Sequence, residues 1–551
     1  MKGSPVKLDS AAKAVVTALW LSLGVFVVFP FVRLLWITFT VDGAPSLGTL
    51  IPVATNWYNQ LAFRNSLLLG LAVATCGTAL GFLFAYGVTR LHLSKPFIWI
   101  INAVVMLPLI SPPFTSSIAL TLSLGPNGTL LKLFGLKSIG FYGFSGTFIS
   151  ETLTYFPIAY MTLATVLSRL DPNLEDAAYS MGASPWRTFR TVTLPLSLPG
   201  VANSFLLLFA ASLADFATPL VLAGHSFPVL PTQAYLQITG LYDLKGGAAL
   251  SFMLLAPALA VYALQHLWLE KKSFVTISGK SGGRSSVKGP GPAARTAMMG
   301  VMDLVLAFVL YLYGLILWGS VVKVWGVNPT PTLQNYAYVF SFGRKAIMDT
   351  LLVALIATPL GGLLAVFVGT ASARWKIRGR KTLETVSLLN YALPGTVVGI
   401  AYVVAFNSKP LVLTGTISVL VAAYVFRYAS AGIRQVIATM QQIDPSIEEA
   451  SASLGAGSGR TFRLVTLPLV LPAVLSGMKY LFIHSMTAIS ATIFLVSVRW
   501  SLLTTRILEC MTELQFAHAC AFSIVLILIV FVAGGVLNLL ARALYRGRGV
   551  A

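Results

Sequence analysis

Twelve stretches of mainly apolar residues recur along this chain, each long enough to cross a bilayer as a helix, which takes about 20 such residues. Backbone polar groups in lipid must be bonded internally, so spans of this kind are helical. The pattern predicts an all-α polytopic membrane protein with two tandem six-helix units. The expected spans are 14–40, 66–89, 97–122, 147–168, 194–222 and 248–269, followed by 298–325, 349–373, 384–406, 413–433, 466–496 and 519–541.

The charged residues support a membrane protein and indicate its orientation. They make up only 10% of the chain, against about 25% in soluble domains. The net charge of +21 does not indicate a nucleic-acid partner, because Lys and Arg sit in short loops beside apolar spans and not in one basic domain. With an even number of spans, about 25 of the 38 basic residues fall on one side, which the positive-inside rule makes cytoplasmic. We therefore expect both termini in the cytoplasm.

A polar segment separates the two sets of spans. Residues 270–296 are rich in Gly, Ser, Pro and Lys, a composition typical of a flexible linker. The predicted domains are therefore residues 1–269 and 297–551, joined by a cytoplasmic linker. The linker contains Gly279-Lys280-Ser281, but a phosphate-binding loop requires a glycine where this chain has Phe274. We expect no ATP hydrolysis by this chain itself.

One polar loop occurs twice. Residues 171–199 read DPNLEDAAYSMGASPWRTFRTVTLPLSLP, and residues 444–472 read DPSIEEASASLGAGSGRTFRLVTLPLVLP. The two loops are identical at 18 of 29 positions and lie 448 − 175 = 273 residues apart, so the chain is a tandem repeat of one unit. Apolar spans can match merely because lipid requires apolar residues, whereas a matching polar loop needs another reason. Both loops fall on the side that we assign to the cytoplasm.

Each repeated loop is predicted to form two short helices at the membrane surface. Asp-Pro suits a helix start, and a glycine follows where the first helix ends. Small residues leave a surface that another protein can approach closely, and an acidic pair offers charges to that protein's basic residues. A loop that only connects two spans is the alternative. The helix starts are Asp171-Pro172 and Asp444-Pro445, the glycines are Gly182 and Gly455, and the acidic pairs are Glu175/Asp176 and Glu448/Glu449.

The repeated loops resemble the EAA loop of ATP-binding-cassette importer permeases, in which Gly follows EAA after three residues and Ile-x-Leu-Pro follows after nine more. EDAAYSMGA and EEASASLGA, each followed by TLPL, fit this pattern. The departures are mild: an acidic residue replaces the first Ala in both copies, Ser451 follows in the second, and Thr193 and Thr466 stand where Ile is common. The resemblance implies that each loop docks on an ATPase subunit and transmits its closure to the spans. It assigns this coupling to Glu175, Asp176, Ala177, Gly182, Arg187, Glu448, Glu449, Ala450, Gly455 and Arg460.

The resemblance also implies partners and a substrate. Two copies of an ATPase subunit would bind the fused permease and use the ATP, so that no cofactor is bound by this chain. A periplasmic binding protein would deliver the solute across the bacterial inner membrane. Fused permeases of this size are similar to those for ferric iron, as is the segment SLADFATPLVLAG at 212–224. Polyamine, thiamine and phosphonate systems are the alternatives within the family.

Two other classes of protein are alternatives to the permease. An ion-coupled secondary transporter shares the topology, but the loop between spans two and three, RLHLSKP, lacks the basic pattern typical of that class. A membrane-embedded enzyme would need a constellation of His, Asp and Glu that the sequence does not contain. The three cysteines form no metal-ligand pattern and predict neither a disulfide framework nor a metal site.

Candidates for the substrate path are polar residues inside apolar spans. Asp215 is one, because a carboxylate in lipid is costly unless paired or hydrated; its alternative role is to cap a helix break. Its counterpart 273 residues later is Ala488, so such a site would be one-sided. His484 is the second candidate, with a helix-packing hydrogen bond as its alternative, and Arg427 is expected to extend toward the cytoplasm. Breaks in the third and ninth spans are predicted at Pro108, Pro112, Pro113 and Pro394.

Overall fold

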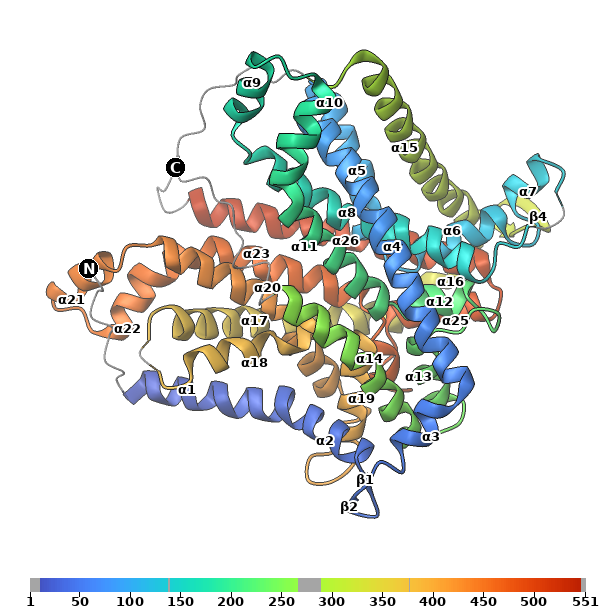
Figure 1. The fold of residues 1–551 in the computed structure, drawn as a ribbon. Helices are drawn as coiled ribbons and strands as arrows, with labels where there is room; N and C mark the ends of the chain where they lie inside the picture. Colours follow the sequence, from blue (N-terminus) through green and yellow to red (C-terminus); the bar gives the residue numbers. More distant parts are fainter. Residues whose placement is uncertain (1–9, 137–138, 266–288, 376, 547–551) are drawn as a thin grey trace.

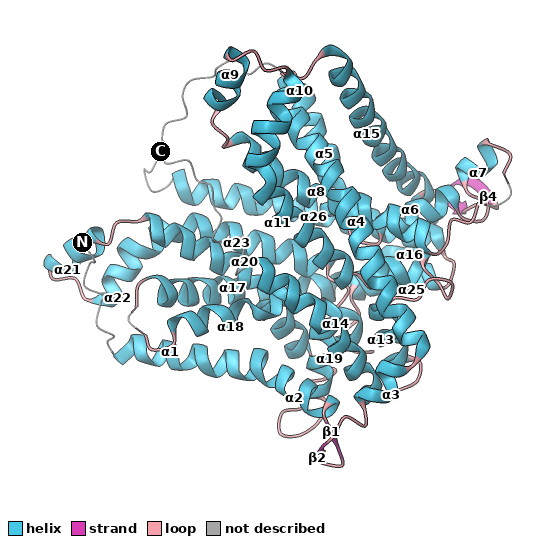
Figure 2. Ribbon diagram, in the orientation of Figure 1, coloured by secondary structure: helices cyan, strands magenta, loops and turns pink. Residues whose placement is uncertain are grey.

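The computed structural model describes residues 10–136, 139–265, 289–375 and 377–546 (Figure 1). Within these ranges the protein is helical apart from two small antiparallel hairpins (Figure 2). The expected all-α polytopic architecture is confirmed. Most of the predicted linker, residues 270–288, lies outside the described residues.

The first half runs from α1 to α14. After its first span it makes a hairpin in which Thr40 pairs with Pro45. Its elements are α1 (Ser10–Leu23), the π-helical turn η1 (Gly24–Val28), α2 (Phe29–Thr38), β1 (Thr40–Val41), β2 (Ala44–Pro45), α3 (Leu50–Thr55), α4 (Trp57–Arg90), α5 (Lys95–Ile110), α6 (Thr115–Leu124), α7 (Thr129–Leu133), α8 (Phe144–Ser168), α9 (Pro172–Ser180), α10 (Pro185–Thr188), the π-helical turn η2 (Phe189–Thr193), α11 (Leu194–Ala214), α12 (Ala217–Leu222), α13 (Leu230–Thr239) and α14 (Leu244–Leu264).

The second half repeats this order, including a hairpin after the first span, in which Val322 pairs with Pro331. Its elements are α15 (Pro292–Ser320), β3 (Val322–Val324), β4 (Asn328–Pro331), α16 (Gln334–Ser341), α17 (Arg344–Ala373), α18 (Arg380–Ala392), α19 (Gly395–Phe406), α20 (Ile417–Gln442), α21 (Ser446–Ser453), α22 (Ser458–Thr461), the π-helical turn η5 (Phe462–Thr466), α23 (Leu467–Thr487), α24 (Thr492–Leu495), α25 (Leu503–Thr512) and α26 (Phe516–Arg546).

The described helices account for the expected spans. Nine are long and apolar enough to cross a membrane, and the number is 11 when each of two strongly bent helix pairs counts as one span. The twelfth is α8, whose 25 residues include Glu151 and many hydroxyl side chains that lower its hydropathy. It packs against α4 and α11 as α20 packs against α17 and α23, so it holds the place of a span in the repeat.

The bent pairs lie where the prolines predicted breaks. The chain turns by 99° between α5 and α6 and by 107° between α18 and α19. Proline removes a backbone donor and disfavours the helical conformation of the residue before it, so each helix stops there. In the second half Arg427 donates hydrogen bonds to the carbonyls of Asn390 (3.0 Å) and Leu393 (2.9 Å) at the break. The guanidinium group is thus held at the break by carbonyls that the interrupted helix leaves free, and its direction relative to the cytoplasm stays a prediction.

The two halves interlock through their first spans. The helices α1 and α2 pack on α17, α18 and α19 of the second half, whereas α15 packs on α4, α5 and α6 of the first. One apolar core accordingly joins Phe84 and Phe156 to Leu306 and Phe522, and another joins Leu23 to Tyr402. The α9–α10 and α21–α22 segments lie at one side of the bundle, together with the starts of α1 and α15, and the hairpins lie at the other (Figure 1).

Candidate functional site

The first repeated loop, residues 171–199, forms α9, a tight turn, α10 and a π-helical turn that leads into α11. Asp171 caps α9, because its carboxylate accepts a hydrogen bond from the backbone N–H of Asn173 at 3.0 Å. In the second repeated loop the Asp444 carboxylate accepts from the N–H of Ser446 at 2.9 Å. Hydrogen bonds from Ser446 hold the pKa of Asp444 below its usual range, so the cap is charged at neutral pH. The predicted start of α9 at Pro172 is confirmed, whereas α21 begins one residue later than predicted, at Ser446.

Gly182 and Gly455 make the tight turns after α9 and α21. Their φ angles are +82° and +83°, a left-handed conformation that L side chains rarely adopt. The N–H of Gly182 bonds to the carbonyl of Tyr179 at 2.9 Å, and that of Gly455 bonds to Ala452 at 3.0 Å. A Cβ at either position would meet no atom of the described residues within 4 Å. Backbone conformation therefore requires glycine, while the space beside the turn is open to a partner.

A π-helical turn joins each loop to the span that follows. It covers Phe189–Thr193 in the first half and Phe462–Thr466 in the second. Pro195 and Pro468 stand two residues after these turns, in the first turn of α11 and α23. A proline ring clashes with the carbonyl four residues earlier, and the wider π-helical turn lies where that clash would fall. The loop and the span are thus one continuous helical segment, which suits the transmission of movement.

A buried Arg–Glu–Thr cluster ties the first repeated loop to two spans. Arg90, the last residue of α4, places its Nε 3.1 Å from Glu175 Oε2 and donates from Nη2 to Oε1 at 3.1 Å. Thr193 Oγ1, just before α11, donates to the same Oε1 at 2.9 Å. The side chains of Arg90 and Glu175 are only 7% and 5% exposed. The carboxylate of α9 therefore holds the ends of α4 and α11 together.

The second repeated loop contains the same cluster. Arg374, directly after α17, has its Nε 3.5 Å from Glu448 Oε2. Thr466 Oγ1 donates to Glu448 Oε1 at 2.8 Å, and Arg374 Nη2 donates to the carbonyl of Ile443 at 2.6 Å. The two charged side chains are 13% and 12% exposed. This ion pair is therefore both longer and more exposed to solvent than that of Arg90 and Glu175.

These clusters correct one expectation and add residues that the sequence reasoning missed. Glu175 and Glu448 do not present their charges at the surface, because helical periodicity turns Glu175, with Ala178, toward the bundle. Arg90 and Arg374 were counted only as orienting charges. They lie 374 − 90 = 284 residues apart and the loops 273 apart, so the loop offset does not align them. The sequence feature that could have identified them is that an arginine ends the second span of each half.

The remaining predicted coupling residues lie on the outer surface of the loops. Apolar side chains stand out there as well: Met181 and Leu454, at equivalent positions, are 82% and 89% exposed. Exposed apolar side chains on a polar, non-lipid surface indicate a protein contact. The residues of the predicted set that are exposed or half-buried are Asp176, Ala177, Gly182, Arg187, Glu449, Ala450, Gly455 and Arg460.

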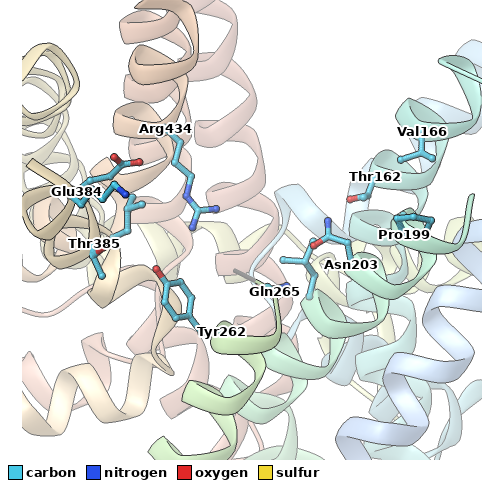
Figure 3. A pocket seen from close by; sticks show the side chains of 13 residues that line it. Thr162, Val166, Pro199, Asn203, Tyr262, Gln265, Glu384, Thr385 and Arg434 are labelled. Atoms are coloured by element: carbon cyan, nitrogen blue, oxygen red, sulfur yellow. The ribbon is translucent and has the colours of Figure 1, made fainter. Parts of the chain in front are cut away.

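A cavity of about 860 Å³ lies between the two halves. Its walls come from α8, α11 and α14 of the first half and from α18 and α20 of the second (Figure 3). Val166 and Lys381 place it near the ends of α8 and α18 that adjoin the repeated loops, so it lies on that side of the bundle. Among the described residues its lining is Thr162, Val166, Pro199, Gly200, Asn203, Leu207, Tyr262, Gln265, Lys381, Glu384, Thr385, Leu388 and Arg434.

The two residues predicted for the substrate path do not line this cavity as described. Asp215 ends α11, is 3% exposed, and accepts hydrogen bonds from the N–H groups of Ala217 (3.0 Å) and Thr218 (3.3 Å). This is the helix-break cap that was its alternative role. His484 Nδ1 lies 3.0 Å from the carbonyl of Tyr480, on whose ring it stacks, as the packing alternative expects. Their part in transport stays a prediction.

The comparisons with known proteins agree with the loops and the duplicated architecture. Residues 66–273 and 357–549 each match the family model "Binding-protein-dependent transport system inner membrane component". The chain is 37% identical over 486 residues to the putative ferric transport system permease protein FbpB 1 of Haemophilus influenzae, an alignment that covers 86% of this chain and 76% of that protein. It is 35% identical over 518 residues to the ferric transport system permease protein FbpB of Actinobacillus pleuropneumoniae, covering 92% and 74%.

A shorter relative aligns with one part of the chain. The molybdenum transport system permease protein ModB of Haemophilus influenzae is 33% identical over 184 residues, which cover 31% of this chain and 77% of that protein. The chain is thus a multi-pass inner membrane protein that belongs to the family of binding-protein-dependent transport permeases and carries the family's domain twice in one polypeptide.

Proposed function

We propose that this chain is the permease of an ATP-driven importer that moves ferric iron from a periplasmic binding protein into the cytoplasm. The observation that supports ferric iron as the substrate is that two relatives named as ferric transport system permeases align with 86% and 92% of the chain. A relative named for 2-aminoethylphosphonate transport aligns with only 43% of it at 28% identity, which is weaker support for that alternative. Because the chain belongs to the family of binding-protein-dependent transport permeases, the alternative of an ion-coupled secondary transporter is excluded.

Two copies of an ATPase subunit dock on the exposed surfaces of the repeated loops, one on each. Met181 and Leu454 supply apolar contact, and the open space at Gly182 and Gly455 admits the partner's backbone. Closure of the ATPases pushes α9 and α21. The buried Arg–Glu–Thr clusters pass this movement to the spans, because each ties the loop to the ends of two long helices. ATP is used by the partner, and this chain binds no cofactor of its own.

The face that carries the repeated loops is cytoplasmic, as are both termini. The support is the positive charge of that side together with the side of the bundle on which α1 begins. The binding protein docks on the opposite face, where the two hairpins lie (Figure 1). The cavity lies on the loop side of the bundle, which supports assigning the described conformation to the state that releases solute into the cytoplasm.

Reconstitution tests this proposal. The chain is co-expressed with the ATPase and binding protein encoded beside it, and the complex is placed in liposomes that contain ATP. We expect uptake of radioactive ferric iron from the loaded binding protein, and none when ATP is replaced by a non-hydrolysable analogue. ATP-dependent uptake of a phosphonate or polyamine without uptake of iron would refute the substrate. Uptake without an ATPase subunit would refute the coupling.

A further inference from the structure

Two carboxylates lie inside the first half, away from the cavity and the repeated loops. Glu151 of α8 is fully buried, and Asp215 at the end of α11 is 3% exposed. Ser212, in the last turn of α11 next to Asp215, donates a hydrogen bond from Oγ to Glu151 Oε2, which brings the two carboxylates near each other. The other oxygen of each carboxylate, Glu151 Oε1 and Asp215 Oδ2, has no hydrogen-bond partner among the described residues. Tyr155, one turn along α8, interacts with both carboxylates, and its phenol is directed at Asp215.

The second half serves as an internal control for this acidic pair. At an offset of 273 residues, Tyr424 replaces Glu151 and Ala488 replaces Asp215. Tyr424 is satisfied by a hydrogen bond of 2.7 Å with Thr492, and Ala488 needs no partner. The same helix packing, α8 on α11 and α20 on α23, thus forms without any carboxylate. Packing does not require the acidic pair, and burying two interacting carboxylates opposes folding. Their presence in one half indicates a chemical role.

The acidic pair lies on a line that leads to the central cavity. Eleven residues turn an α-helix by about 1100°, which returns to within about 20° of the starting direction. Glu151 therefore shares a face of α8 with Thr162, and Tyr155 shares it with Val166, and both of these distal residues line the cavity. The separation of Glu151 from Thr162 is about 16 Å at 1.5 Å per residue. The pair occupies the outer part of the same helix face.

We propose that Glu151, Asp215 and Tyr155 form a transient binding site for the transported trivalent cation on its way from the outer face to the cavity. This inference rests on the proposed function. A small, highly charged cation prefers carboxylate and other anionic oxygen ligands. Two carboxylates and a phenolate carry three negative charges, which balance the cation when the phenol releases its proton to water. Among the described residues no third His, Cys, Asp or Glu side chain joins the two carboxylates, and Tyr155 is the side chain beside them that supplies a third oxygen.

Such a site should bind weakly enough to release its cargo. Its three protein ligands leave further coordination positions to water, and none of the three residues lines the cavity in the described structure. The unpartnered oxygens Glu151 Oε1 and Asp215 Oδ2 are the atoms that we expect to bind the cation. In the second half Tyr424 and Ala488 replace the two carboxylates and only Tyr428 matches a proposed ligand, so one site serves the whole transporter.

The test uses the full complex with its ATPase subunits in lipid nanodiscs, with ferric nitrilotriacetate as the probe. A phenolate bound to ferric iron gives a visible charge-transfer band. We expect this band in the wild-type complex, its loss in Tyr155→Phe, and its retention in Tyr428→Phe, the equivalent substitution in the second half. We expect Glu151→Gln combined with Asp215→Ala to lower ATP-driven iron uptake at least tenfold, while ATP hydrolysis stimulated by the binding protein stays within twofold.

Several results would overturn the inference while leaving the proposed function intact. These are iron uptake without a charge-transfer band, a band that survives Tyr155→Phe, and uptake in the double variant equal to that of the wild type. If the double variant fails to assemble, the band in Tyr155→Phe and Tyr428→Phe decides alone, since each removes one hydroxyl. A wild-type complex that transports no iron would instead overturn the proposed function.

Discussion

The buried ion pair of the first repeated loop should be worth more than that of the second, and one matched pair of substitutions measures the difference. Glu175→Gln leaves Arg90 charged and 7% exposed without its counter-charge. Removing one partner of a buried pair costs about 3 kcal/mol at the lower end of the usual range. Glu448→Gln acts on a pair that is 3.5 Å apart with side chains 12–13% exposed, where about 1 to 2 kcal/mol is expected.

These free energies should appear as local opening of the loops, because each carboxylate holds a short surface helix against the spans. At about 1.4 kcal/mol per tenfold change, the loss at Glu175 predicts amide exchange in α9 faster by on the order of 100-fold. The loss at Glu448 predicts exchange in α21 faster by about 5- to 30-fold. The measurement is hydrogen–deuterium exchange with mass spectrometry on the purified chain in nanodiscs.

A control separates the ion pair from charge alone. Asp176→Asn removes the same charge from the next residue, which forms no side-chain ion pair in the described structure, so exchange in α9 should change by less than about twofold. The reasoning is refuted if Glu175→Gln alters exchange in α9 no more than Asp176→Asn does. It is also refuted if α21 responds to Glu448→Gln more strongly than α9 responds to Glu175→Gln.

Three further predictions follow from the loops and the helix contacts. Gly182→Val strains a backbone position with positive φ and fills the open space beside the turn. It should therefore reduce co-purification of the ATPase at least fivefold with little change in folding. Full retention of the ATPase would contradict the proposed docking surface. Gly477→Leu should abolish the monodisperse peak in size-exclusion chromatography, because a Cβ at this position would already lie 2.4 Å from the Cα of Gly432 on the facing helix. A normal elution profile would show that α20 and α23 can separate. Arg427→Leu leaves the two carbonyls at the α18–α19 break unpaired and should lower the free energy of unfolding by about 2 kcal/mol. The measurement is the melting temperature, which should fall. An unchanged melting temperature would mean that water replaces the guanidinium group.

The parts of the fold that follow from local properties could be read from the sequence. The spans are local runs of apolar residues, and the breaks at Pro113 and Pro394 follow from a missing backbone donor. The turn at Gly182 was also predictable, since a helix that ends in a left-handed residue uses glycine. The span α8 was predicted despite Glu151, whose charge lowers its hydropathy.

The pairing of side chains from distant segments could not be read in this way. Glu175 was expected at the surface, but its partner Arg90 lies 85 residues earlier in the chain. Glu151 stood unremarked inside a span until the structure placed it beside Asp215. Arg427 was expected to extend toward the cytoplasm, whereas its guanidinium group donates hydrogen bonds to carbonyls of the broken helix beside it.

The sequence by itself determined that this is a duplicated helical membrane protein with two matching polar loops, because hydropathy, helix punctuation and repetition are properties of neighbouring residues. Only the tertiary structure decided which charges face a partner and which are buried, where the cavity between the halves lies, and that Glu151 lies near Asp215. Those features depend on which helices meet. A charge in lipid or in a protein interior is tolerated only when a second segment supplies its partner.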